Sequence, residues 1–273
     1  MMQKKQDQVK DIFQNVAIKY DEIEFFKISA RHVAEIVKAK QTKENLKILD
    51  VACGTGNVVL VCASCLKDAQ FEAMDISDGM LAVAKENAQQ QGVDNVCFTL
   101  QDITKLSLDR KYDVITCSYA LFFLPDAVNV LKSLMLHLNE GGTLIFTSFL
   151  DKAFSPTVNR LLPLLVKYGS PSAKEYDMNK WENLKHEADI ERLCSEANIT
   201  QFEIQTKEIR YPLNLDEWWE LLNNTGFSGM LMELSSKNYE HVKVELFEAL
   251  VEYKDEEGCV ELIADSYFTV VNA

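Results

Sequence analysis

The chain has 273 residues, of which 47% are hydrophobic and 26% charged, a balance typical of a globular protein that can bury a full core. The 28 Lys and Arg against 42 Asp and Glu give a net charge of −14, which argues against nucleic acid as a partner, because such affinity rests on neutralising phosphates. The N-terminus is polar and no apolar stretch approaches the ~20 residues that cross a bilayer. We therefore expect a cytoplasmic protein that does not bind membranes.

The first predicted elements are two amphipathic helices, over residues 7–20 and 22–38. From residue 46 onward, short apolar strands alternate with helices. The strands are expected at 46–52, 71–77, 95–102, 112–121 and 141–150, and the helices at 57–67, 78–92 and 126–139. Continuous apolar strands are typical of a parallel sheet that is covered on both faces, and the alternation implies right-handed crossovers. The pattern predicts a doubly wound α/β fold.

Beyond residue 150 the pattern is looser and more helical. Helices are expected near 187–197, 215–224 and 238–253, and two further strands at 201–211 and 259–271. These strands complete a mostly parallel seven-stranded sheet, with a helical lid inserted before the last strand. We predict one domain over 1–273, with N-terminal helices in 1–44, a ligand-binding core in 45–150, and lid helices and final strands in 151–273.

The stretch "LDVACGTGNVVL" (49–60) places a glycine turn directly after the first strand. A nicotinamide-binding turn needs a third glycine for close helix packing beneath a pyrophosphate, and here only Gly54 and Gly56 are present. Asp50, Asp75 and Asp102 end three successive strands, at the edge where open α/β sheets bind ligands. Carboxylates there suit a cation, ribose hydroxyls and the amine of a base. The pattern predicts S-adenosylmethionine rather than a dinucleotide.

Five segments, "ILDVACGTGNVV", "FEAMDISDGMLAVAKENA", "VCFTLQDITKL", "YDVITCSYALFFLPD" and "LNEGGTLIFTSF", resemble in order and spacing the motifs of class I S-adenosylmethionine-dependent methyltransferases. The early stretch "VKDIFQNVAIKYDEIEFF" resembles the N-terminal helices of the small-molecule, quinone-biosynthesis-like branch. The resemblance implies that Asp50 binds the methionine end of the cofactor and Asp75 the ribose. The full cofactor set that it implies is Asp50, Cys53, Gly54 and Gly56, then Asp75, Ile76 and Met80, then Asp102 and Ile103.

The acceptor is expected over the fourth strand, near "SYALFFLPD". Tyr119 ends that strand and is predicted to face the methyl group, while Tyr20 is predicted to close over the cofactor. These two tyrosines are the candidate catalytic residues. The candidate substrate residues are Phe122, Phe123, Arg210, Trp219, Asn223 and Asn224. Core packing of the phenylalanines and a helix end at the asparagines are the structural alternatives.

The acceptor itself stays open at this point. Polar residues in the expected lid favour a small polar acceptor. The chain also has a weak resemblance to the methyltransferase domain of ovothiol-type synthases. Together these features favour methyl transfer to a nitrogen of an amino-acid-like or imidazole acceptor, such as a thiohistidine. The alternative is an O- or C-methyltransferase of a quinone or secondary metabolite. A non-catalytic S-adenosylmethionine-binding protein and a dehydrogenase with a degenerate loop are hypotheses of other classes. No metal site is expected, and the oligomeric state cannot be read from the sequence.

Overall fold

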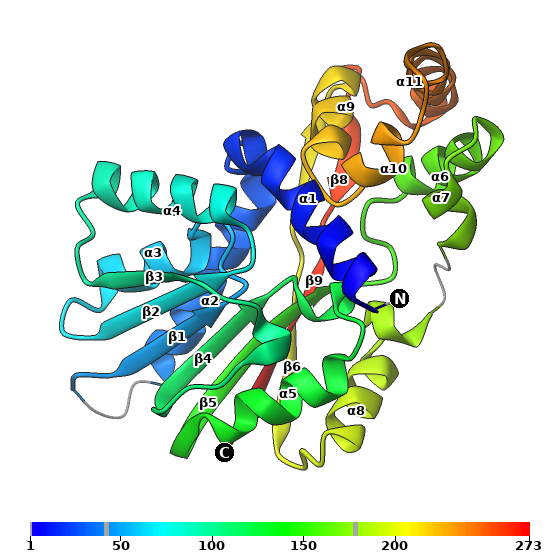
Figure 1. Cartoon of the computed structure of the whole chain (residues 1–273). Helices are drawn as coiled ribbons and strands as arrows, with labels where there is room; N and C mark the ends of the chain where they lie inside the picture. The colour runs from blue at the N-terminus through cyan, green and yellow to red at the C-terminus, as the bar shows by residue number, and fades with distance from the viewer. Residues whose placement is uncertain (1, 41–43, 177–179) are drawn as a thin grey trace.

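A seven-stranded sheet runs through the molecule in the order β3-β2-β1-β4-β5-β9-β6 (Figure 1). The structure is a computed structural model that describes residues 2–40, 44–176 and 180–273. The strands are β1 (Lys47–Val51), β2 (Gln70–Asp75), β3 (Val96–Leu100), β4 (Tyr112–Ser118), β5 (Leu138–Phe149), β6 (Phe202–Lys207) and β9 (Ser266–Asn272). The strands β1 to β5 are parallel and β9 is antiparallel to both of its neighbours. The predicted doubly wound, mostly parallel sheet is confirmed.

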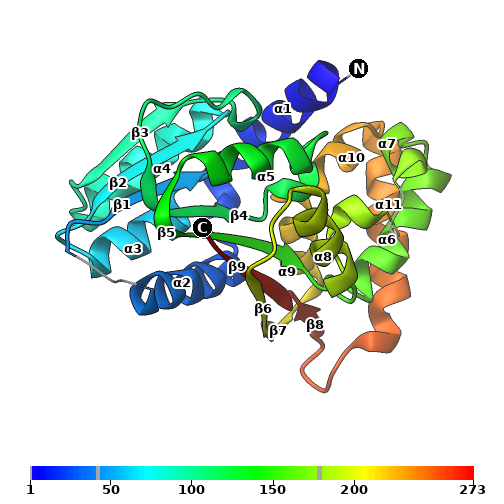
Figure 2. The ribbon, with the colours of Figure 1, turned by 90° about the horizontal axis from the view of Figure 1, so that it is seen from below.

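Helices cover both faces of this sheet. The helices α2 (Glu24–Ala39), α3 (Asn57–Cys65) and α4 (Asp78–Gln91) share one core, and α5 (Ala127–Leu136) and α8 (Glu187–Glu196) share the other. Figure 2 shows α2 and α3 on the opposite side of the sheet from α5. In β1, Ile48 belongs to the first core and its neighbour Leu49 to the second, and both are buried. Burial on both faces explains why the strands are apolar without alternation.

A lid stands above the carboxyl end of the sheet (Figure 1) and has a hydrophobic core of its own. It contains α6 (Thr157–Lys167), α7 (Pro171–Glu175), α9 (Leu215–Asn223), α10 (Ser228–Met232), α11 (Ser236–Leu250) and the two-stranded ribbon β7 (Arg210–Leu213) with β8 (Val260–Ile263). Trp218 is fully buried in this core and donates its indole N–H to the carbonyl of Val260. The predicted helical insertion before the last strand is therefore present.

Two predicted strands are each divided in the structure. The run 201–211 becomes β6 and β7, and the run 259–271 becomes β8 and β9. Asp265 lies at the division: its carboxylate accepts the amide of Ile209 at 3.0 Å and pairs with the Arg210 guanidinium at 2.6 Å. The amide of Ile209 thus bonds a side chain instead of a neighbouring strand. At this point both segments leave the seven-stranded sheet and enter the two-stranded ribbon.

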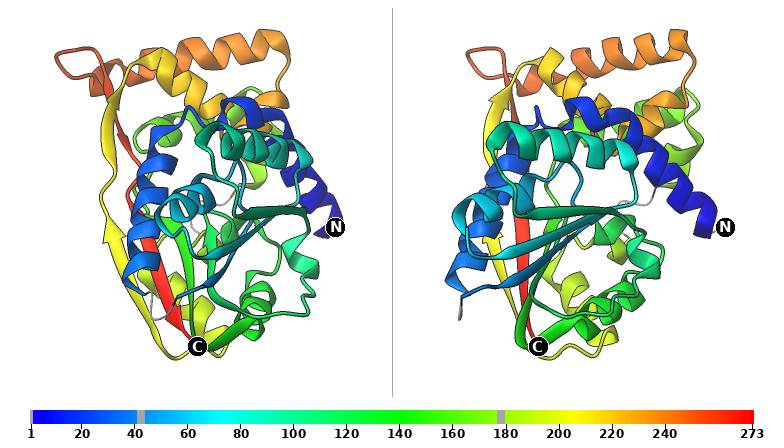
Figure 3. Two further views of the ribbon diagram at one scale, coloured as in Figure 1. Left: turned by 90° about the vertical axis from the view of Figure 1, so that its left-hand side faces the viewer. Right: turned by 60° about the vertical axis from the view of Figure 1, so that its left-hand side comes forward.

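The N-terminal helix α1 (Met2–Tyr20) crosses the top of the sheet between α4 and the lid (Figure 3). A β-carbon added to Gly229 of α10 would lie 2.4 Å from Ile12 Cδ1, so α1 meets the lid at close range. The helix therefore connects the sheet to the lid above the strand ends.

The described residues, 2–40, 44–176 and 180–273, contain neither a bilayer-spanning helix nor a cluster of metal-ligating side chains. None of the described helices has the length and apolar content to cross a bilayer. In the same ranges, no three or more His, Cys, Asp or Glu side chains are grouped to hold a metal ion.

Candidate active site

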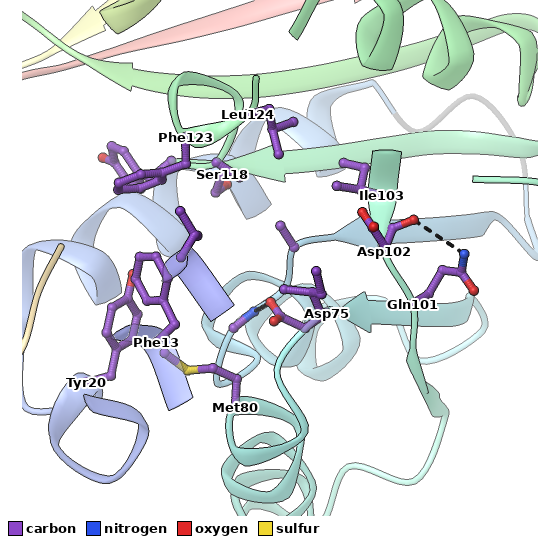
Figure 4. Close-up of a pocket in the computed structure, with 16 residues that line it drawn as sticks. Phe13, Tyr20, Asp75, Met80, Gln101, Asp102, Ile103, Ser118, Phe123 and Leu124 are labelled. Atoms are coloured by element: carbon purple, nitrogen blue, oxygen red, sulfur yellow. Dashed lines mark hydrogen bonds between the residues drawn. The ribbon is translucent and has the colours of Figure 1, made fainter. Parts of the chain in front are cut away.

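Two adjoining cavities open at the carboxyl ends of β1, β2 and β4. The first encloses about 800 Å³ and the second about 410 Å³, including space open to solvent. These sizes lie in the usual range for small-molecule sites. Figure 4 shows side chains from α1, the strand ends and α4 around the first cavity. The two linings share Tyr20, Ala52, Gly54, Ser118 and Tyr119.

The glycine turn forms the floor between the cavities. Gly54 lines both of them at φ +55°, and its amide donates to Asp75 Oδ2 at 2.8 Å. Gly56 lies in neither lining. At φ +87° it starts α3, and a β-carbon there would lie 3.2 Å from Leu60 and 3.4 Å from Ala84. The missing side chain of Gly56 thus serves helix packing, and this glycine of the predicted cofactor set lies outside both cavity linings.

Asp75 ends β2 in the first cavity (Figure 4). Its Oδ1 accepts the amide of Ser77 at 2.9 Å, and its Oδ2 accepts that of Gly54. Burial raises the pKa of Asp75, and these two amides oppose the rise. Each carboxylate oxygen has two lone pairs, so the fixed carboxylate still has capacity for two hydroxyl donors. This arrangement suits the vicinal hydroxyls of a ribose.

Asp50 ends β1 in the second cavity and is 2% exposed. Its Oδ1 accepts the Thr116 hydroxyl at 2.7 Å, while Oδ2 is buried without a hydrogen-bond partner. Burial raises the pKa of Asp50 to about 7, against the lowering effects of the Thr116 hydroxyl and the Val59 amide. A buried carboxylate oxygen without a partner is costly, and a ligand ammonium would satisfy it.

One part of the first cavity is largely apolar. Ile76, Met80 and Ile103 line it, and Asp102 lies at its rim with Gln101 (Figure 4). Asp102 Oδ1 accepts the amide of Thr104 at 2.9 Å and thereby starts a short 3₁₀ turn. Partial burial raises the pKa of Asp102, but bonds from Thr104 and Lys105 outweigh it, so the pKa is lowered and the group is a carboxylate. Ile76, Met80, Asp102 and Ile103, four residues of the predicted cofactor set, thus line one part of the same cavity.

Tyr119 follows β4 with φ +51°, a conformation that bulky side chains rarely adopt and that functional sites often contain. This turn ends β4 at Ser118, whereas the sequence predicted a strand to 121. The Tyr119 ring lines both cavities. Its hydroxyl is buried and forms hydrogen bonds with two serine hydroxyls, Ser29 Oγ at 2.9 Å and Ser266 Oγ at 2.8 Å. Burial raises its pKa to about 12, so the phenol stays protonated at neutral pH.

The N-terminal helix closes the upper side of the cavities. Most of its contacts have no signal in the sequence. Val9, Phe13 and Tyr20 line the first cavity. At the helix end, Asp21 accepts the Thr55 hydroxyl and the side-chain amides of Asn57 and Asn87. Gln14 Oε1 accepts the Ser77 hydroxyl at 2.8 Å and the Gly79 amide at 3.0 Å. These bonds tie α1 to the glycine turn and to the start of α4.

Replacing Asp21 with alanine is expected to weaken S-adenosylhomocysteine binding about tenfold and to lower the melting temperature. The change removes an acceptor that Thr55 of the glycine turn, Asn57 of α3 and Asn87 of α4 share, so the bonds that hold α1 to these elements are lost. Calorimetric titration and thermal unfolding measure the two effects. The exposed neighbour Glu22, changed to alanine, is the control. Equal behaviour of both variants would contradict a role of α1 in shaping the site.

One of the predicted acceptor residues lines the first cavity, and the others lie outside it. Phe123 lines the first cavity, in edge contact with Phe13 at 5.4 Å between ring centroids, whereas Phe122 lies behind it and contacts Phe149. The remaining four predicted residues, Arg210, Trp219, Asn223 and Asn224, lie in neither lining.

Contacts elsewhere occupy the side chains of Arg210, Trp219 and Asn223. Arg210 is paired with Asp265, and Trp219 donates to the Tyr239 hydroxyl at 3.0 Å. That hydroxyl donates to Asn223 Oδ1 at 2.9 Å, and Asn224 ends α9. Because these side chains contact other groups of the protein and lie outside both cavity linings, the structure does not bring them to the acceptor space, and their role in binding the acceptor stays a prediction.

A family model described as a methyltransferase domain matches residues 42–216, more than half of the chain. The chain belongs to this methyltransferase family. The match and the fold place this domain among the class I methyltransferase domains, whose cofactor is S-adenosylmethionine. The unpartnered Asp50 Oδ2 and Ser118 Oγ, and the cradle at Gly54, fit that cofactor.

Named relatives include malonyl-[acyl-carrier protein] O-methyltransferase of Bacillus cytotoxicus, 35% identical over 144 residues, or 52% of this chain and 50% of that protein. The chain thus spans about half the length of the malonyl-acyl-carrier relatives. Demethylmenaquinone methyltransferase of the same organism is 28% identical over 64% of this chain and 79% of its own length. Aklanonic acid methyltransferase DauC of a Streptomyces species is 28% identical over 71% and 94%.

Solved structures agree on the fold. YcgJ from Bacillus subtilis has a TM-score of 0.56 at 16% identity, covering 89% of this chain and 97% of its own. Magnesium protoporphyrin IX methyltransferase from Synechocystis PCC 6803 has a TM-score of 0.52 at 20% identity, over 75% of this chain and 89% of its own. At such low identity these likenesses speak for the architecture alone.

Proposed function

We propose that the enzyme methylates an oxygen or carbon of a small acceptor whose body is apolar and aromatic, such as a phenol or an enol. The observation that carries this proposal is the wall of the first cavity beyond the strand ends. Val9 and Phe13 of α1 face this space together with Phe123 and Leu124, which follow β4. Aromatic rings there provide a large apolar contact area for a flat acceptor.

The sequence favours a polar imidazole acceptor, and that hypothesis rests on polar residues that contact other groups of the protein in this structure. Arg210 and Asn223 are bonded within the lid and ribbon. The relatives supply independent support for the alternative hypothesis, since their names include quinone and aklanonic acid methyltransferases. We therefore propose the quinone-like or secondary-metabolite class for this chain.

The residues of the site position and enclose the reactants rather than move protons. When bound, S-adenosylmethionine would supply an activated methyl group: an aligned lone pair of the acceptor attacks the methyl carbon, the methyl–sulfur bond breaks, and S-adenosylhomocysteine leaves. Burial raises the pKa values of Tyr20 and Tyr119, so neither is a base at neutral pH. In the cavity linings of the described chain there is no histidine or lysine. We infer that the acceptor brings its own nucleophilic anion or lone pair.

An acceptor panel tests this proposal. Purified enzyme is incubated with S-adenosylmethionine and, separately, a reduced naphthoquinone, a substituted phenol, imidazole and a thiohistidine, and formation of S-adenosylhomocysteine is measured. We expect turnover with the naphthoquinol or phenol. We also expect Phe123→Ala to raise the KM of that acceptor about tenfold with little change in cofactor affinity, because the variant loses an aromatic wall.

The exposed Leu136, changed to alanine, is the control for that variant, because it lies on the outer side of α5 at 73% exposure. Turnover confined to the imidazole compounds would overturn the proposal. An unchanged KM in Phe123→Ala would instead show that the acceptor binds away from this wall.

A further inference from the structure

The two cavities hold different parts of the predicted cofactor site. Asp50 and Cys53 line only the second cavity, and Asp75 and Asp102 line only the first. The methionine end and the adenosine end of the cofactor therefore occupy different cavities. The sulfonium joins these two ends covalently, so it belongs at the junction. The junction is lined by the five shared residues, of which only Tyr20 and Tyr119 carry aromatic rings.

Both rings at the junction are held by stacking on other rings. Tyr20 stacks on Phe26 at 4.5 Å between centroids with an interplanar angle of 24°. Tyr119 stacks on Phe149 at 4.4 Å and 19°. A stacked ring is restricted in rotation, and the face or edge that it presents to a ligand is preset. Aromatic faces attract cations, and the attraction is stronger where water is excluded.

The Tyr119 ring has a second restraint at its hydroxyl. Ser29 of α2 is 1% exposed and Ser266 of β9 is fully buried, and the phenol lies between them at 2.9 and 2.8 Å. Ser266 Oγ lies in turn 2.8 Å from the carbonyl of Ala264, to which it can donate. The chain thus places two buried hydroxyls from distant elements on one phenol whose proton the chemistry does not use. Their position suits orientation of the ring.

We propose that the rings of Tyr20 and Tyr119 form an aromatic clamp on the cofactor's sulfonium, and that Ser29 and Ser266 are positioning residues for the Tyr119 ring. The clamp binds the charged S-adenosylmethionine more tightly than the neutral thioether S-adenosylhomocysteine. It therefore favours loading of the cofactor and release of the product. The inference rests on the cofactor and is independent of which acceptor the enzyme uses.

The test compares dissociation constants of S-adenosylmethionine and S-adenosylhomocysteine, measured by calorimetry on the full chain. Both ligands carry the same amino, carboxylate, ribose and adenine groups, so the ratio of their dissociation constants isolates the S-methyl group and its positive charge. We expect Tyr119→Leu and Tyr20→Leu each to weaken S-adenosylmethionine about tenfold more than S-adenosylhomocysteine. Ser29→Ala and Ser266→Ala should shift the ratio in the same direction by about threefold, and Ser29→Thr, which keeps a hydroxyl, should restore it.

Two buried residues serve as matched controls. Tyr112→Phe removes a phenol from the other end of β4, where it bonds Glu72, and Ser148→Ala removes a fully buried hydroxyl that bonds the carbonyl of Leu184. Neither should change the ratio, even if the melting temperature falls. Equal weakening of both ligands in both leucine variants would overturn the clamp. Should one leucine variant fail to fold, an unchanged ratio in the other and in Ser29→Ala would overturn it equally.

Discussion

Asp75→Ala is expected to weaken S-adenosylhomocysteine binding about 100-fold, equivalent to about 3 kcal/mol. Two effects combine. The ribose hydroxyls lose a charged acceptor, and hydrogen bonds to charged groups contribute about 1.5–3 kcal/mol each. The amides of Gly54 and Ser77 also lose the carboxylate that holds the turn in place. Calorimetric titration measures the loss.

A second ligand shows where the Asp75 effect acts. 5′-Methylthioadenosine carries the adenosine but lacks the amino-acid end, and we expect Asp75→Ala to weaken it to a similar degree. Glu72→Gln is the control, because it lies on the same strand and bonds Arg110 and Tyr112 outside both linings. Unchanged affinity of Asp75→Ala for both ligands would mean that the adenosine lies elsewhere.

Asp50→Asn is expected to weaken S-adenosylhomocysteine about 100-fold while leaving 5′-methylthioadenosine nearly unchanged. The substitution keeps the shape of the side chain but removes the charge that faces the ligand ammonium in a buried site. The two ligands together separate the ends of the cofactor: Asp75→Ala affects both, and Asp50→Asn only one. Equal losses for both ligands in Asp50→Asn would place the ammonium away from β1.

The same carboxyl predicts a pH dependence of binding. Burial raises the pKa of Asp50 from 3.8 to about 7, so the ligand-free group is largely protonated below that pH. A protonated carboxyl must lose its proton to pair with the ammonium. The affinity for S-adenosylhomocysteine should therefore fall about tenfold from pH 8 to pH 6 in the wild type and stay level in Asp50→Asn. A level profile in the wild type would contradict the assignment.

The stability of the ligand-free protein should change in the opposite sense. A raised pKa means that the folded chain keeps the Asp50 proton to higher pH than the unfolded chain, so its contribution to stability is lost as the pH rises through about 7. Asp50→Asn removes this penalty. The variant should gain melting temperature over the wild type, more at pH 8 than at pH 5, although it binds the cofactor more weakly.

Much of the cofactor site is local in the sequence, and this is why it could be predicted. Each acid lies at or just beyond the carboxyl end of its own strand, and parallel strands bring these ends to one edge. Asp50, Asp75 and Asp102 can therefore be predicted as cofactor-binding residues from the sequence alone. The order of the strands follows from the same alternation of elements and right-handed crossovers.

The other half of the site depends on contacts between distant segments, which periodicity does not encode. The Tyr119 hydroxyl meets Ser29 and Ser266, which are 90 and 147 residues away. The sequence suggests that Arg210 is free to bind an acceptor, but in the structure its guanidinium pairs with Asp265, which lies 55 residues later. A carboxylate inside an apolar strand pattern was the one local sign that the strand would divide there. Lid packing thus decides which polar residues remain for a substrate.

The crystal structure of the enzyme with S-adenosylhomocysteine is the most direct test of the central claim. The account predicts both ribose hydroxyls within hydrogen-bonding distance of the Asp75 carboxylate, the ammonium on Asp50 Oδ2, and the sulfur between the rings of Tyr20 and Tyr119. A ribose bound away from Asp75, or a sulfur that contacts neither ring, would contradict it.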